Sequence, residues 1–132
     1  MSKLGIELHD STIEALAVED ADLVLNCVVY VHESGDPGVA PGTGRFHDAV
    51  IRVKDFECER EEFEFPLLLD GGSLVLNGRR SDEILPYPLD EEGETALLLE
   101  PRESSEFLIR GSGIEIELHG PQGEIEAFPG SN

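Results

Sequence analysis

Hydrophobic residues recur at every second position along much of this chain, which is the period of a β-strand. In the segment DLVLNCVVYVH, residues 22–32, both alternating sets are largely apolar, and this is typical of a central strand buried on both faces. In AVIRVKDF, residues 49–56, and GIEIELHG, residues 113–120, one set is apolar and the other mixed or polar, which predicts strands with a wetter face. The glutamates of the last segment would also discourage edge-to-edge pairing of two sheets.

Further segments follow the same two-residue period, and turn-forming residues separate them. The segments are 12–18, 63–69, 73–76, 95–99, 106–110 and 125–128. The stretches at 70–72, 77–80, 85–94, 111–113 and 119–123 are rich in residues that favour turns, namely Gly, Pro, Asn and Asp. We therefore expect one all-β domain over residues 1–132, an antiparallel β-sandwich or flattened barrel of roughly eight or nine strands.

The stretch HESGDPGVAPGTGRFHDAV, residues 32–50, is the first candidate for a site. If strands 23–32 and 49–56 pair as a hairpin, the connection of about 16 residues is longer than most hairpin loops and favours a functional role. Its base would bring His32 near His47, and Asp48 or Asp36 could complete a site for a divalent metal ion such as zinc, with His9 as a further ligand. No HExxH or EF-hand spacing is present, so a long turn whose histidines cover strand ends remains the alternative.

Other chemistries find less support in the sequence. The Gly-rich stretch lacks the GxxxxGK[ST] order of a phosphate-binding loop. Ser11 follows His9 and Asp10, but neighbours on an extended chain point to opposite faces and cannot form a catalytic triad. Carboxylates are so frequent that no acid–base pair stands out. We therefore predict no catalytic residue, and no cofactor unless the 32–50 stretch binds a metal ion.

Charge narrows the range of partners. The chain has 9 Lys and Arg against 29 Asp and Glu, a formal net charge of −20 at pH 7. Such a protein repels nucleic-acid phosphates and anionic membrane surfaces, whereas it attracts cations or a basic protein. The alternative explanation is a composition adapted to a saline habitat. Self-association is also open, because strand 23–31 and the LPYPL segment, residues 85–89, could form an exposed apolar patch and a homodimer interface rather than core.

The chain ends and the cysteines predict a compartment. The opening MSKLGIELHD has no apolar run of the kind found in signal peptides, and no apolar stretch is long enough to span a bilayer. Cys27 and Cys58 form no CxxC motif and no disulfide framework. We expect a cytoplasmic protein with two reduced, buried thiols; a disulfide between neighbouring strands is the alternative.

The opening LHDSTIEALAV followed by a strand resembles a group of small bacterial β-rich proteins that begin with an apolar–His–Asp–Ser stretch. Some of these look like immunity-type proteins that bind and neutralise a toxin. The resemblance covers the first 30 residues, with an echo in GSGIEIELHG and EAFPG, and it implies His9, Asp10 and Ser11 as a fold-defining turn. It implies a binding protein rather than an enzyme. We therefore expect a non-catalytic acidic interaction protein with a basic protein partner, and a metal-binding protein or metal-dependent enzyme as the rival.

Overall fold

The computed structural model describes residues 3–34, 43–60 and 62–127, and the regular elements in these ranges are all β-strands. The strands are β1 (Lys3–Glu19), β2 (Asp22–Ser34), β3 (Thr43–Lys54), β4 (Glu57–Cys58), β5 (Leu67–Leu76), β6 (Arg79–Asp82), β7 (Ile84–Tyr87), β8 (Leu89–Pro101) and β9 (Phe107–Ala127). The prediction of an all-β fold with eight or nine strands is confirmed. Among the described residues, no helix is long and apolar enough to cross a membrane.

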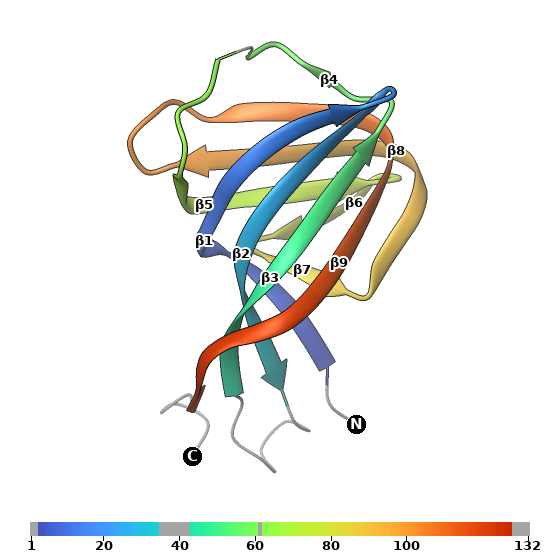
Figure 1. The fold of residues 1–132 in the computed structure, drawn as a ribbon. Helices are drawn as coiled ribbons and strands as arrows, with labels where there is room; N and C mark the ends of the chain where they lie inside the picture. Colours follow the sequence, from blue (N-terminus) through green and yellow to red (C-terminus); the bar gives the residue numbers. More distant parts are fainter. Residues whose placement is uncertain (1–2, 35–42, 61, 128–132) are drawn as a thin grey trace.

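Six strands close into an antiparallel barrel (Figure 1). Their order is β5-β8-β9-β3-β2-β1, and short pairing of Thr12 with Leu68 and of Ile13 with Leu67 joins β1 back to β5. β6 pairs with β5, β7 with β1, and β4 with β9, so these three strands lie outside the closed ring. Of the two predicted architectures, the barrel is therefore the one that forms.

The interior of the barrel is filled by one of the two alternating sets of each strand. On β2 the inner set is Leu23, Leu25, Cys27, Val29 and Val31, and all five side chains are buried. The other strands contribute their inner residues to the same cluster, including Ile6, Leu8, Ile51, Val53, Leu74, Leu97, Ile109 and Ile114. Each such aliphatic side chain contributes about 1.5–3 kcal/mol by its removal from water.

Three of the predicted turns are wrong, because their glycines lie inside long strands. Residues 70–72 belong to β5, and residues 111–113 and 119–123 belong to β9. A Cβ atom at Gly72 would lie 2.9 Å from Leu8 Cδ1, and one at Gly111 would lie 2.5 Å from the carbonyl oxygen of Lys54. Glycine is needed at these points because strands of a tight barrel bend and approach each other closely there.

The predicted strand 63–69 and the predicted turn 85–94 are also corrected. β5 begins only at Leu67, and Phe63 and Phe65 lie in a segment that we call the strap, described over residues 55–60 and 62–66 and irregular outside β4, where their rings stack 6.2 Å apart. Phe63 and Phe65 therefore have the two-residue spacing of a strand but lie in an irregular segment, where their rings stack on each other. Residues 85–94 contain most of β7 and the beginning of β8 instead of an open turn.

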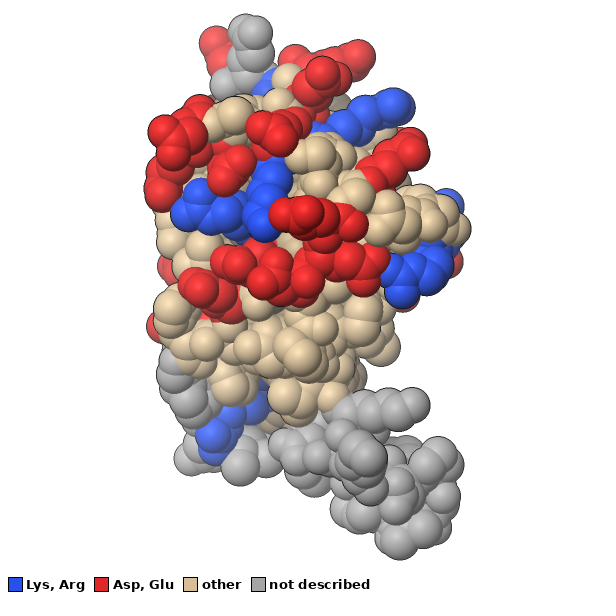
Figure 2. All heavy atoms as spheres, turned by 90° about the vertical axis from the view of Figure 1, so that its right-hand side faces the viewer, with Lys and Arg blue, Asp and Glu red and all other residues tan. Residues whose placement is uncertain are grey.

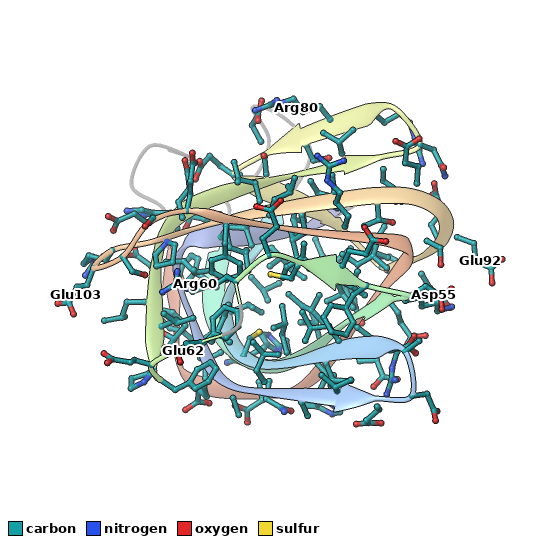
Figure 3. All side chains as sticks on the ribbon, turned by 90° about the horizontal axis from the view of Figure 1, so that it is seen from above. Asp55, Arg60, Glu62, Arg80, Glu92 and Glu103 are labelled. Carbon is teal, nitrogen blue, oxygen red and sulfur yellow. The ribbon has the colours of Figure 1, made fainter. Side chains whose placement is uncertain are left out.

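The chain covers both ends of the barrel. At the upper end of Figure 1, the strap runs across the mouth and pairs with β9 through Glu57 and Cys58. The guanidinium of Arg60 lies 5.3 Å from the ring centroids of both Phe63 and Phe107, at the rim of the barrel (Figure 3). At the lower end, the chain passes from β7 beside β1 to Leu89, which is paired with Ile116 of β9.

Four strands continue beyond the lower end of the barrel (Figure 1). The extensions are residues 3–7 of β1, 30–34 of β2, 43–47 of β3 and 117–127 of β9. Together with β7 they form an open sheet in the order β7-β1-β2-β3-β9, which we call the lower sheet. This sheet carries the residues that the sequence marks as a candidate site.

Candidate functional site

The register of the lower sheet determines which of its side chains share a face. Tyr30 is paired with Glu7 on one side and with Phe46 on the other. The next row on the same face is formed by His32, which is paired with Gly5 and Gly44. Because Val29 and Val31 point into the barrel, Tyr30 and His32 lie on its outer surface.

The outer face of the lower sheet holds a compact aromatic and polar cluster. The Tyr30 ring makes edge-to-face contacts with His32, at a centroid distance of 5.1 Å, and with Phe46, at 5.0 Å. Nε2 of His32 lies 3.2 Å from Oε2 of Glu7, and about a quarter of each side chain is exposed. Tyr30 is only 8% exposed, so this cluster packs as a small secondary core.

The HDS stretch of the opening motif shapes the strand beside this cluster. The register of β1 against β2 shifts between Glu7 and Thr12, and Asp10 has a φ of 70°. In the resulting bulge, the hydroxyl of Ser11 donates to the carbonyl oxygen of Glu7 and accepts the N–H of Tyr30. These contacts give Ser11 a structural role, in line with a fold-defining turn rather than a nucleophile.

The three predicted metal ligands do not lie on a common face. His47 is paired with Val29 and shares the inner face, where its Nδ1 lies 3.1 Å from the carbonyl oxygen of His119. Asp48 and His32 are on the outer face, with Asp48 paired to Val28 and His32 to Gly44. His9 is exposed at the bulge, with Nδ1 3.3 Å from Asp10 Oδ2.

Among the described residues, no group of three or more His, Cys, Asp and Glu side chains is arranged to hold a metal ion. Asp36, the remaining predicted ligand, lies outside the described residues. The metal site at His32, His47 and Asp48 therefore stays a prediction, without support from the described geometry.

The long edge of β9 is the feature that the sequence did not suggest. β8 pairs with β9 from Phe107 to Ile116, and β3 pairs on the other side as far as Ala127. In the part of the chain that the structure describes, no strand pairs with β9 on the β8 side from Glu117 to Ala127. This stretch, which we call the open edge, presents backbone N–H and C=O groups without a neighbouring strand.

The surroundings of the open edge are acidic. Asp90 of β8 is paired directly with Glu115 of β9, and Glu117 follows on the same face. Arg52, which lies opposite Glu115 on β3, instead contacts Glu19 and Asp22, at 3.1 and 3.2 Å. Its hydrogen bonds to Glu19 and then Asp22 raise the pKa of Arg52. Figure 2 shows this side of the molecule, where acidic side chains form a broad belt, interrupted by smaller basic groups, over the upper and middle part, and mostly uncharged residues lie below the belt.

A second polar cluster lies at the seam where β1 meets β5. Arg102 Nε donates to Asp70 Oδ1 at 2.8 Å, and Arg102 Nη2 lies 3.7 Å from Asp10 Oδ1. The hydrogen bond to Asp70 is the main reason that the pKa of Arg102 is raised. Because Asp10 and Asp70 both lie at strand irregularities, we assign this cluster to closure of the barrel.

The thiols of Cys27 and Cys58 are both free, and burial makes the thiol of Cys27 unreactive. Cys27 points into the core and is 5% exposed, whereas Cys58, in the strap, is partly exposed. Burial raises the pKa of the Cys27 thiol to about 12, and the nearby carboxylate of Glu14 adds to the shift. The prediction of free thiols is confirmed, with the correction that only Cys27 is fully buried.

Two open hollows flank Arg60 at the upper end of the barrel. The first, of about 970 Å³, is lined by Phe65, Leu68 and Arg102 among others, and the second, of about 1010 Å³, contains Cys58 and Arg110. Each mixes arginines with several glutamates, so neither presents a field of one sign to a charged ligand.

No protein-family model, no curated protein and no solved structure matches this chain. The function proposed below therefore has its support in the strands, charges and contacts already described.

Proposed function

We propose that the protein is a non-catalytic acidic binding module whose partner is a basic protein. The observation that carries the proposal is the excess of acidic over basic residues on β8 and β9, where Arg79 is paired with Glu91 alone among the described carboxylates of β8 and β9. Neither residues 89–101 nor residues 111–132 contain any Lys or Arg. Among the described residues, no lysine or arginine forms an ion pair with Asp90, Glu115 or Glu117.

A surface of this kind favours association with a cationic partner in two ways. Its field increases the rate of encounter, and it disfavours wrong, anionic partners. The resemblance of the opening residues to immunity-type proteins supports the same class of function. The two free thiols support a reducing, cytoplasmic location as part of this proposal.

A set of end-blocked peptides tests the proposal. Peptides of equal length with net charges of about +4, 0 and −4 are titrated by calorimetry at about 50 mM and about 300 mM salt. We expect binding of the cationic peptide alone, and a clear loss of affinity at the higher salt concentration. Equal binding of all three peptides, or binding that is insensitive to salt, would contradict the proposal.

A further inference from the structure

We propose that the open edge of β9, residues 117–127, docks an extended basic segment of the partner as an added β-strand. This inference rests on the proposed function and specifies its docking surface. Strand addition to a sheet edge uses main-chain hydrogen bonds for affinity and alternating side chains for specificity. The structure supplies a backbone edge that no described strand covers, and at its start the side chains of Glu117 and Leu118 lie on alternate faces.

Pro88 explains why the edge is open. The β8–β9 ladder ends with the pair Leu89 and Ile116, and to continue it Pro88, the residue before β8, would have to pair with Glu117. A proline has no N–H to donate to such a ladder, and here the chain turns away towards β7 on the far side of the lower sheet. β9 nevertheless continues to Ala127, because β3 supports its other side.

Two other edge strands, β7 and β6, are protected in ways that the open edge is not. β7 has only four residues, and Pro86 within it cannot donate a hydrogen bond to a new strand. β6 is equally short and carries Arg79 and Arg80. The open edge is longer than either of these strands. An uncovered edge of this length usually invites pairing with another chain.

The side chains next to the open edge define the partner's sequence pattern. Glu115 and Glu117 lie on the outer face, and Glu117 is exposed. Leu118, the next residue, is only partly buried and lies on the inner face with Ala49. A partner strand that matches both faces therefore has Lys or Arg at alternate positions and apolar residues between them.

The same charges argue against a second copy of this chain as the occupant. Parallel pairing of two open edges in register would place Glu117 of one molecule beside Glu117 of the other, and any such pairing would join two strongly acidic molecules. Like charges across a strand pair are destabilising, and each molecule carries a net charge of −20. The glutamates thus discourage self-pairing and favour a cationic strand.

The experiment uses the full chain and two end-blocked heptapeptides. In the first, lysine and valine alternate; in the second, the central valine is replaced by proline, which keeps the charge and prevents strand pairing. We expect the alternating peptide to bind at least about tenfold more tightly than the proline peptide at about 50 mM salt, since it alone can form the backbone ladder. Amide exchange should slow within residues 117–127 in its complex.

Two matched double variants test whether the peptide binds next to the open edge. The double charge reversal Glu115→Lys with Glu117→Lys should weaken binding by about fivefold or more, because it replaces two attractions by repulsions. The control, Glu59→Lys with Glu103→Lys, makes the same change in net charge at the upper end of the barrel and should have a much smaller effect. Both pairs are at the surface, and circular dichroism checks that the variants keep their fold.

The outcomes separate the two proposals. Equal, salt-sensitive binding of both peptides, or protection confined to other strands, overturns the docking edge and leaves the basic-partner function standing. A salt-insensitive interaction, or no binding of any cationic peptide, overturns the function itself. A stable dimer in sedimentation experiments, with amide exchange slowed within residues 117–127 in the absence of any peptide, overturns the edge proposal in favour of a second copy.

Discussion

The ring of Tyr30 on β2 lies directly over Gly44 on β3, so that a Cβ atom at residue 44 would come within 2.5 Å of Tyr30 Cζ. A cross-strand aromatic ring that covers a glycine shields the bare backbone and fixes its own position. Gly44 is paired with His32, and Tyr30 contacts the His32 ring from the same strand. The aromatic cluster of the lower sheet therefore depends on the absence of a side chain at residue 44.

We expect Gly44→Ala to lower the free energy of unfolding by about 1–3 kcal/mol, because the Tyr30 ring must leave its place for the new methyl group. Chemical denaturation measures the effect. In a Tyr30→Ala background, the same substitution should cost much less, because the ring that blocks it is gone. A cost that is equal in both backgrounds would show that Tyr30 is not the obstacle.

Arg60 holds the strap onto the barrel. Its Nε donates to the carbonyl oxygen of Glu62 and its Nη1 to that of Ser105, while the guanidinium plane faces Phe63 and Phe107. Lysine can provide neither the planar contact nor both hydrogen bonds. We expect Arg60→Lys and Arg60→Ala to lower stability by similar amounts, about 1–2 kcal/mol.

Amide exchange locates the effect of the Arg60 variants. Exchange should become faster in residues 55–60 and around Ser105, while the central strands β2 and β3 keep their protection. If Arg60→Lys behaves as the parent protein, charge alone holds the strap, and the stacking and hydrogen bonds contribute little.

Cys27 makes stability depend on pH in the alkaline range. Its pKa is about 12 in the folded protein, against 9.0 for an ordinary thiol, so the unfolded chain loses this proton first. The stabilisation is complete below pH 9 and is lost as the pH rises towards 12, with a slope of up to about 1.4 kcal/mol per pH unit. Denaturation at several pH values between about 8 and about 10.5 gives this slope.

The Cys27→Ala variant should be less stable throughout, because it leaves a small cavity, but its decline above pH 9 should be shallower. Cys58→Ala retains Cys27 and serves as the control, with the slope of the parent protein. Parallel curves for the parent and Cys27→Ala would refute the role of the buried thiol.

The direct pairing of Asp90 with Glu115 places two carboxylates opposite each other. We expect Asp90→Lys to raise the free energy of unfolding by about 0.2–1 kcal/mol at low salt, because a cation then faces Glu115. The gain should shrink at high salt as the charges are screened. Glu59→Lys, which changes the net charge equally far from this pair, should give a smaller gain; an equal gain would assign the effect to net charge alone.

The two-residue period was sufficient to predict β2, β3 and the alternating inner and outer sets of residues. It could not separate the glycines of true turns from Gly72 and Gly111, because that difference arises from Leu8 and Lys54, which are distant in sequence. The closure of the barrel through Thr12 and Leu68 is likewise a long-range contact without a local pattern.

The candidate site, like the fold, could be predicted from the sequence only in part. The hairpin of β2 and β3 was predicted, and with its register known the strand period places His32 and His47 on opposite faces. The register itself could not be derived, and the predicted connection of about 16 residues was wrong, because β2 continues to Ser34 and β3 begins already at Thr43. The open edge depends on where the β8–β9 ladder ends, although Pro88 was a local sign that the ladder could not continue.

The two alternating sets of side chains on β9 face in opposite directions. Ile114 and Ile116 belong to the packed interior, while Glu115 and Glu117 face outwards between and after them. Substitutions in the outward set leave the interior untouched, so under the proposed function single-codon changes there alter the choice of target while the scaffold is preserved.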